Sequence, residues 1–173
     1  MNSAVLSDCG LYRYRLDREV CEPYEGSKVF AFFGVNPSTA DATLDDATVR
    51  KWWGFTLRNG GHRFIIGNVF SYRATDVRHL AGPIEPKGPD HHAHLHGIIR
   101  EADVLVPCWG NSGKVPPRLR QSIDDLLLSL TLSGKPVMHF GFTKSGDPKH
   151  PLMLGYSTPL RNWHGPSRDR LQA

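Results

Sequence analysis

Four short segments of the chain combine apolar, β-branched and aromatic residues and are bounded by turn residues. They are KVFAFFGV at 28–35, RFIIGNVF at 63–70, ADVLVPCW at 102–109 and PVMHFGF at 136–142. Nearly every position in them is apolar, rather than every second one, which is typical of strands covered on both faces, as parallel strands are. The pattern predicts a four-stranded, mostly parallel sheet.

Between these segments, apolar residues recur at intervals of three and four, which predicts helices. The first helix follows TLDD at 43–46, which resembles a capping box, and ends at the turn NGG. The second begins after Asp90, a candidate N-cap, and runs to Arg100. The third follows Pro117 and ends at SGKP. Its apolar stripe consists of Leu119, Ile123, Leu126, Leu127 and Leu130.

The two ends of the chain differ from this strand-helix alternation. GLYRYRLDREVCE at 10–22 alternates as an antiparallel edge strand or hairpin would, with LDRE as the turn, so residues 1–27 are expected to form a small N-terminal β-hairpin appendage. Residues 156–173 show little periodicity and are expected to be irregular. We therefore expect one α/β domain over 1–173, built as a three-layer α/β/α sandwich.

The composition narrows the class of protein. The chain has 173 residues, and its 21 Lys and Arg against 17 Asp and Glu give a net charge of +4, which mildly favours a polyanionic partner. Its three cysteines lie too far apart for a zinc knuckle, and their odd number argues against a secreted disulfide framework. Neither a signal peptide nor a long apolar run is present. These features predict a cytoplasmic protein with reduced thiols and no membrane partner.

Polar, glycine-rich or basic turns follow all four predicted strands, where ligands bind in parallel sheets. In the first turn, Asn36 would be held by a rigid strand, so that its amide can orient a water or a base edge. Pro37 would stiffen the exit, and Ser38 and Thr39 would offer hydroxyls and backbone N–H groups to a phosphate. The alternative is a turn that only caps the next helix.

Two further features have a chemical and a structural interpretation. In the run DHHAHLH at 90–96, His92 and His96, or Asp90 and His94, lie one helical turn apart and suggest a metal site. The run would spread its side chains around the helix, so we favour a solvated helix face and predict no metal or other cofactor. Cys108 ends a strand and is expected to be a small buried hydrophobe, with a nucleophile as the alternative.

Several fragments together resemble a known family. RYRL, NPSTAD, DDATVRK, NVFSYRAT, CWG and GFTKSGDPKHPL, in this order over residues 12 to 154, are similar to an uncharacterised bacterial and phage family of unknown function. More distantly, FFGVNPS, GNVFSYRAT and KHPL resemble three motifs of the uracil-DNA glycosylase superfamily, especially its mismatch-specific branch. The second resemblance implies that superfamily's fold and hydrolysis of an N-glycosidic bond.

The glycosylase resemblance also implies roles for single residues. Asn36 would position the attacking water, and His150 would steady charge on the departing base, without a metal. Phe70 or Tyr72 would stack on the base. Arg73, Lys144 and Lys149 would hold phosphates. The other predicted substrate-binding residues are Pro37, Ser38, Thr39, Asp41, Trp109 and Gly110.

The sequence departs from the superfamily at two places, and two other functions are also considered. Ser38 stands where the superfamily has glycine, and the acids Asp41, Asp45 and Asp46 have no counterpart there. The partner is expected to be DNA or a nucleotide. The alternatives are a non-catalytic nucleic-acid or nucleotide-binding module on the same fold, and a metal hydrolase built on the histidine run at 91–96.

Overall fold

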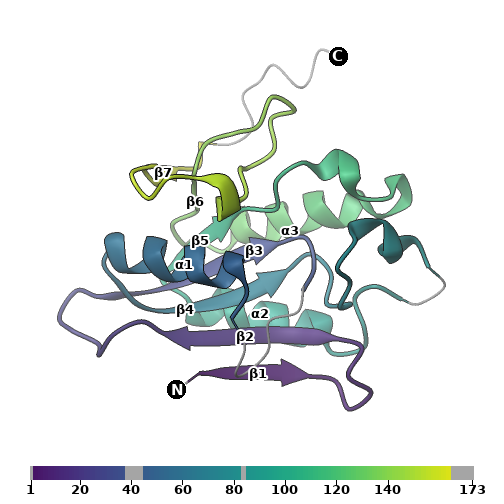
Figure 1. Ribbon diagram of the computed structural model, residues 1–173, viewed down its shortest axis with the longest axis horizontal. Coiled ribbons are helices and arrows are strands. Elements are labelled where there is room, and N and C mark those ends of the chain that lie inside the picture. The colour runs from purple at the N-terminus through teal and green to yellow at the C-terminus, as the bar shows by residue number, and fades with distance from the viewer. Residues whose placement is uncertain (1, 38–44, 83–84, 165–173) are drawn as a thin grey trace.

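A five-stranded mixed sheet forms the centre of the molecule in a computed structural model, which describes residues 2–37, 45–82 and 85–164 (Figure 1). The strand order is β1-β2-β4-β3-β5, and β3 runs parallel to both β4 and β5, whereas β1 and β2 are antiparallel to their neighbours. The strands are β1 (Ser3–Leu6), β2 (Arg13–Glu19), β3 (Lys28–Gly34), β4 (Gly61–Asn68) and β5 (Val104–Pro107).

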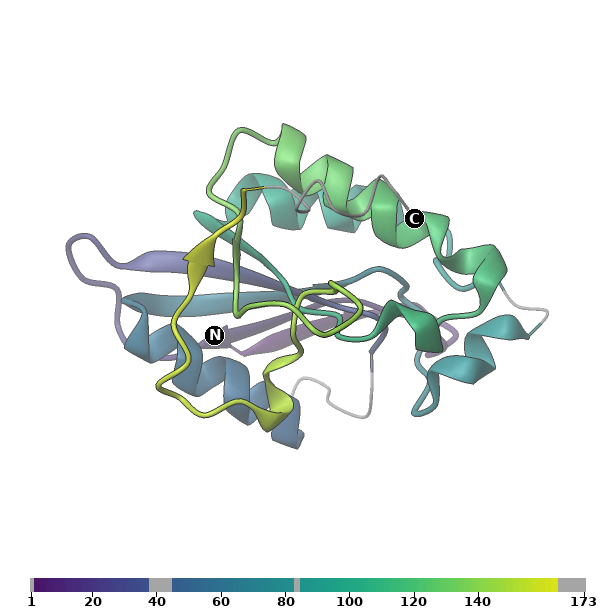
Figure 2. The same ribbon diagram turned by 90° about the horizontal axis from the view of Figure 1, so that it is seen from above.

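Helices cover both faces of this sheet, as Figure 2 shows. Helix α1 (Ala47–Arg58) lies on one face, and α2 (His91–Glu101) and α3 (Gln121–Leu132) lie on the other. Successive residues of a strand point to opposite faces, so Phe30 and Phe32 of β3 pack in the cluster beneath α1, and Phe33 packs in the cluster beneath α2 and α3. Nearly every residue of β3 is apolar because both faces of the strand are covered, as the sequence pattern predicted.

Six short elements complete the described chain, and most of them lie in the loops that follow the parallel strands. They are η1 (Val77–Ala81), η2 (Ser112–Lys114), η3 (Pro117–Leu119), β6 (Met138–His139), η4 (Pro151–Met153) and β7 (Arg161–Asn162). The predicted helices are all present. Asp46 caps α1, since its Oδ1 accepts hydrogen bonds from the backbone N–H of Thr48 at 2.8 Å and of Val49 at 2.9 Å.

The prediction of a sheet with four mostly parallel strands is wrong. The main sheet has five strands, and only β3, β4 and β5 run parallel to one another. The segment predicted over 136–142 contains only β6, which pairs with β7 and touches the main sheet through one bridge between Leu105 and Val137. Pro136 has no N–H to donate to a ladder, and Gly141, with φ of +98°, turns the chain away. The last predicted strand is therefore a short two-residue strand beside the sheet edge.

The N-terminal hairpin belongs to the main sheet rather than to an appendage, because β2 pairs with β4. The predicted turn LDRE lies inside β2. The chain reverses earlier, where the Gly10 N–H donates to the Ser7 carbonyl at 2.9 Å. Two of the three charged residues that suggested a turn, Asp17 and Arg18, are buried, and the Arg18 guanidinium contacts the Asp45 carboxylate at 2.7 Å.

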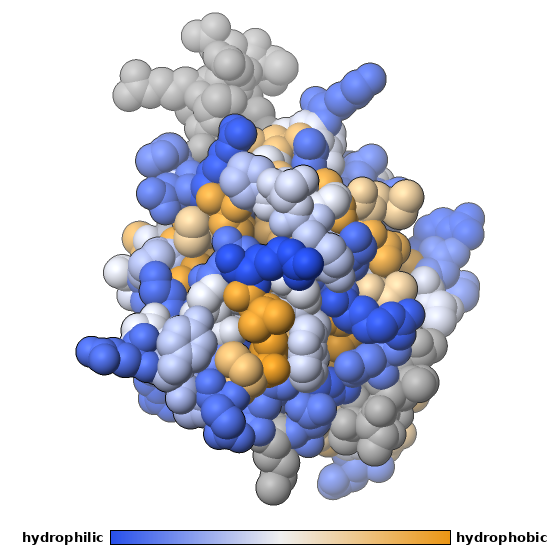
Figure 3. All heavy atoms as spheres, turned by 60° about the vertical axis from the view of Figure 1, so that its left-hand side comes forward, coloured by the Kyte–Doolittle hydropathy of each residue, from blue (hydrophilic) through white to orange (hydrophobic). Residues whose placement is uncertain are grey.

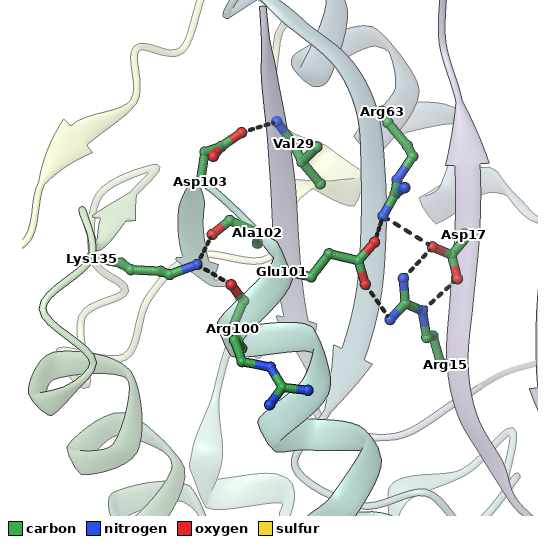
Figure 4. Close-up of polar contacts among 9 residues, drawn as sticks. All are labelled: Arg15, Asp17, Val29, Arg63, Arg100, Glu101, Ala102, Asp103 and Lys135. Atoms are coloured by element: carbon green, nitrogen blue, oxygen red, sulfur yellow. Dashed lines mark hydrogen bonds and ion pairs between the residues drawn. The ribbon is translucent and has the colours of Figure 1, made fainter.

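A network of charged side chains joins β2, β4 and the end of α2 (Figure 4). Arg15 forms ion pairs with Asp17 and with Glu101, both at 2.7 Å, and Arg63 also pairs with Glu101. Hydrogen bonds from Arg15 and Arg63 hold the pKa of the Glu101 carboxyl at about 2, below its usual value. The arginines of this network are thus neutralised by carboxylates.

The surface and the chain ends add three observations. The face on the left of Figure 1 is mostly hydrophilic, with a small hydrophobic patch among polar residues (Figure 3). Within the described part of the chain, none of the helices has the length and apolar character needed to cross a bilayer. The region expected to be irregular from 156 contains β7, and residues 165–173 lie outside the described part.

Candidate functional site

A cavity of about 330 Å³ is lined by residues at the carboxyl ends of the parallel strands β3, β4 and β5. The arrowheads in Figure 1 mark these ends. Asn36 from the loop after β3 and His150 from the loop before η4 both line it, although they are far apart in the sequence. Trp109 and Gly110, which follow β5, line it as well. The structure therefore brings four of the predicted site residues to one cavity.

Hydrogen bonds fix the orientation of the Asn36 amide. Its Nδ2 donates to the backbone carbonyl of Ala74 at 2.6 Å and to that of Pro37 at 3.0 Å. Both acceptors are carbonyl oxygens, so the nitrogen must face them, and the Oδ1 atom is left as the acceptor on the other side. Asn36 can therefore accept a hydrogen bond from a water or a ligand without losing its own position.

The imidazole of His150 is neutral and has a defined tautomer. Its Nδ1 accepts a hydrogen bond from the Leu152 backbone N–H at 3.4 Å, which places the ring proton on Nε2. Burial lowers the pKa of His150 below its usual value, against a smaller opposing effect of the nearby Asp46 carboxylate. The ring also meets the edge of Trp52, with centroids 6.2 Å apart. His150 is therefore a neutral N–H donor near pH 7.

Gly110 allows the histidine loop to approach the end of β5. Its φ is +74°, and a Cβ atom at this position would stand 3.2 Å from the Cβ of His150. The Gly110 N–H donates to the Pro148 carbonyl at 2.9 Å, and the Ser112 N–H donates to the Asp147 carboxylate at 3.1 Å. A side chain at 110 would push His150 away, so glycine is required by both backbone conformation and space.

The sequence analysis missed Asn68, which ends β4 beside Asn36. Its side chain lines the cavity and is only 6% exposed. Among the described residues, no hydrogen bond to the Asn68 amide is found, and its atoms are not among the buried polar atoms that lack a partner, so the amide is open to the cavity. A polar residue that ends a buried strand was the signal that selected Asn36, and the same signal applies to Asn68.

Three charged residues also reach the cavity. Arg13 of β2 is 3% exposed, Lys114 of η2 is exposed, and Asp46 is the N-cap of α1. The described part of the wall thus carries two cations and one carboxylate, and Arg13 and Asp46 are also engaged in other interactions. Arg13 was not selected because its position on a strand of the main sheet was itself not predicted.

The chain belongs to a family described as a protein of unknown function (DUF1643), whose model matches residues 13–152. A comparison with curated proteins and a comparison with solved structures each gave no match. The DUF1643 match begins at Arg13 and ends at Leu152, and both of these residues line the cavity. The span shared with the family therefore contains nearly the whole cavity wall.

The other predicted site residues lie elsewhere. Phe70 is fully buried in the cluster under α2 and α3, so its ring has no free face for a base. Tyr72 contacts Tyr12 edge-on, at 6.1 Å between centroids, and is not part of the cavity wall. Pro37 is buried behind the wall, with its carbonyl bonded to Asn36 and to the Ala74 N–H.

The predicted phosphate-binding residues are not gathered at the cavity. Arg73 donates to the Gly10 carbonyl at 3.4 Å, Lys144 is exposed on the turn that Asp147 organises, and Lys149 lies against Gly141. None of the three lines the cavity. Three further predicted residues lie outside the described part of the chain. They are Ser38, Thr39 and Asp41.

The histidine run at 91–96 occupies α2 and spreads around it. His91 is buried and contacts the Ser71 hydroxyl through Nδ1 at 2.8 Å, His94 stacks on Tyr14 at 5.1 Å, and His92 and His96 are exposed. Within residues 2–37, 45–82 and 85–164, no group of three or more His, Cys, Asp or Glu side chains is arranged to hold a metal ion.

The alternative role of Cys108 as a nucleophile is not supported by its environment. Its side chain is fully buried, and this burial raises the pKa of the thiol to about 12. A nucleophilic cysteine needs access and a thiolate near neutral pH. Cys108 therefore serves as a small core residue in the cluster with Phe32 and Trp52.

Proposed function

We propose that this protein hydrolyses the N-glycosidic bond of a nucleotide whose base enters the cavity lined by Asn36 and His150. The observation that carries the proposal is the joint presence of these two side chains, each with a fixed hydrogen-bonding direction, in one cavity. A cavity of about 330 Å³ with an indole wall and convergent amides suits a flat polar ligand such as a nucleobase.

The chemistry assigned to each residue follows from its hydrogen-bonding capacity. The Oδ1 of Asn36 accepts a hydrogen bond from the attacking water and holds it beside the sugar. The Nε2–H of neutral His150 donates to an oxygen of the base and stabilises the negative charge that develops there as the bond breaks. Asn68 offers a donor and an acceptor to the base edge. Trp109 provides an apolar wall.

The fold supports the same proposal. The parallel strands β3, β4 and β5, with helices on both faces, are compatible with a three-layer arrangement like that of the uracil-DNA glycosylase superfamily. The resemblance assigns the water-positioning role to Asn36 and the base-stabilising role to His150, and both side chains line the cavity. No metal is needed for such a reaction, since preorganised donors supply the electrostatic stabilisation.

The test is a panel of oligonucleotides that carry uracil, mismatched or hypermodified bases, incubated with the protein and then probed for alkali-labile abasic sites. We expect cleavage of at least one member of the panel. Asn36→Ala should abolish it without weakening binding, whereas the matched variant Asn162→Ala, at an exposed position in β7, should retain it. Thermal denaturation of both variants shows whether they are folded.

Two outcomes separate the proposal from the alternative. Binding of nucleic acid by the wild-type protein, with no abasic sites on any oligonucleotide or free nucleotide, would favour a non-catalytic binding module. Full activity of folded Asn36→Ala would remove Asn36 from the mechanism. Both measurements use the intact chain.

A further inference from the structure

A second groove, with a volume of about 810 Å³, lies directly beside the cavity and is more than twice its size. The two spaces share Val77 and Lys114 as wall residues. The groove lies between η1, which follows β4, and the η2–η3 segment, which follows β5. It therefore extends the cavity along the same edge of the sheet.

The groove is basic. Arg78, Lys114 and Arg120 line it, and Asp76 is the acid among its described wall residues. Asp76 forms an ion pair with Arg78. Hydrogen bonds from the side chain and the backbone N–H of Arg78 lower the pKa of the Asp76 carboxyl to about 2. Lys114 and Arg120 therefore provide positive charge beyond this neutral pair.

The Arg120 guanidinium is held in a different way from the arginines on the sheet. Its Nε donates to the Val115 carbonyl and its Nη2 to the Gly113 carbonyl, each at 3.0 Å. Carbonyl oxygens fix the group without cancelling its charge, whereas Arg15 and Arg63 in Figure 4 bind carboxylates. Among the described residues, no hydrogen bond or ion pair engages the Lys114 ammonium.

The two walls of the groove are joined to each other. The Nη2 of Arg118, in η3, donates to the carbonyl of Ala81 at 2.9 Å and to that of Gly82 at 3.2 Å, at the end of η1. A second cation is thus fixed on neutral acceptors at the groove. The spacing of the walls is set before a ligand arrives, which lowers the entropic cost of binding.

We infer that this groove binds the phosphodiester backbone of a single-stranded nucleic acid that continues from the nucleotide in the cavity. Lys114, at the boundary of the two spaces, contacts the phosphate next to that nucleotide, and Arg120 contacts the following one. The inference rests on the proposed function for the occupant of the cavity. It adds that the substrate is a nucleotide within a strand.

The choice of a strand over a free nucleotide follows from size and charge. One nucleotide fills the smaller cavity and places at most its own phosphate at Lys114. The larger space and the charge of Arg120 would then have no ligand. A strand provides phosphates at regular intervals, which matches two cations placed one after the other, Lys114 at the boundary with the cavity and Arg120 in the groove wall alone.

The experiment compares two probes by fluorescence anisotropy and competition: a fluorescein-labelled oligothymidylate of about a dozen nucleotides, and thymidine 5′-monophosphate. Lys114→Glu should weaken oligothymidylate binding at least tenfold, and Lys114→Ala should lower the slope of log affinity against log salt by about 0.7. The matched variant Lys28→Glu makes the same charge change at an exposed position at the start of β3, at the opposite edge, and should leave binding unchanged.

A variant that is expected to bind more tightly provides a further test, because misfolding would weaken binding and not strengthen it. Asp76→Asn removes the acid from the described groove wall and keeps a side chain that can accept the hydrogen bond from the Arg78 N–H at 2.9 Å. We expect tighter oligothymidylate binding, by about threefold to tenfold, with a steeper salt dependence. Unchanged or weaker binding by this variant would overturn the inference, as would unaltered binding by Lys114→Glu.

The result is distinguishable from that of the glycosylase test. Strand binding that depends on Lys114 and Asp76, together with no abasic sites, would uphold the groove and reject the enzyme. Cleavage of free nucleotides alone, unaffected by Lys114→Glu, would uphold the enzyme and reject the groove.

Discussion

The side-chain nitrogen of Asn36 lies 2.6 Å from the backbone carbonyl of Ala74, and this hydrogen bond connects the loops that follow β3 and β4. The Ala74 N–H in turn donates to the Pro37 carbonyl at 3.2 Å. The asparagine is thus both a structural link between two loops and a wall residue of the cavity.

Replacing Asn36 with aspartate should therefore destabilise the fold. A carboxylate cannot donate to the Ala74 and Pro37 carbonyls and would place like partial charges against each other, so the free energy of unfolding should fall by about 1–3 kcal/mol. Urea denaturation measures the change, and Asn162→Asp, at an exposed position in β7, is the control. Equal stability of both variants would show that the hydrogen bond does not hold the amide.

Replacing Asn68 should affect activity more than stability. Because its amide is open to the cavity and has no hydrogen-bond partner among the described residues, Asn68→Leu leaves no protein group unpaired, and we expect a change in unfolding free energy of less than about 1 kcal/mol. Abasic-site formation should fall by on the order of a hundredfold, since the base loses a directional contact. A strong loss of stability with normal activity would show that Asn68 serves the fold alone.

The ion pair between the buried Arg18 and the partly exposed Asp45 should be important for stability. Asp45→Ala removes one carboxylate from the Arg18 guanidinium, which is 1% exposed and keeps its other interactions, and should cost about 1–3 kcal/mol in unfolding free energy. The double variant Arg18→Met with Asp45→Ala removes both charges and should be more stable than Asp45→Ala alone. Denaturation of the two single variants and the double variant gives the coupling energy. Additive effects would contradict the pairing.

Stability should decrease on acidification because of His91. Burial, with smaller effects of His92 and Lys87, lowers the pKa of His91 from 6.5 to about 4 in the folded protein. Below pH 6.5 the unfolded chain binds a proton that the folded protein does not, so the free energy of unfolding falls as the pH drops toward 4, by at most on the order of 3 kcal/mol. Above pH 6.5 this contribution is fully present.

The measurement for His91 is the unfolding free energy between pH 4 and pH 7 in two variants. His91→Gln can still bond to Ser71 but does not titrate, so its curve should be flatter than that of the wild-type protein. His96→Gln, on the exposed side of α2, should follow the wild-type curve. Parallel curves for His91→Gln and wild type would assign the pH dependence to other groups.

The elements that the sequence predicted well are those with a continuous apolar or helical pattern. The first two predicted strands, at 28–35 and 63–70, and the helix capped by Asp46 lie close to their expected positions, because each buries its side chains on both faces of a strand or on one face of a helix. The resemblance to known motifs also selected Asn36 and His150, which reach one cavity.

What the sequence did not predict depends on contacts between distant residues. Arg18 and Asp17 suggest a turn until their distant partners Asp45 and Arg63 are known, and these partners allow a charged segment to form an interior strand of the sheet. In the same way, Phe70 was expected to stack on a base, but the helices α2 and α3 close over it. Local patterns cannot reveal which charges are paired or which rings are covered.

The hydrogen bond from the Gly110 N–H to the Pro148 carbonyl joins the end of β5 directly to the loop that carries His150, although residues 111–147 lie between them in the sequence. Helix α3 and the β6 segment form an excursion whose two ends are tied together at this point. Because the two ends are tied together, a change at an exposed position of α3, such as Leu128 or Leu132, is not passed along the chain to the imidazole of His150, whereas Ile123, Leu126 and Leu130 are held by the core. Variation in this part of the chain is therefore confined to the solvent-facing side of α3, because the inner side of the helix covers the sheet and residues 113–120 form a wall of the groove.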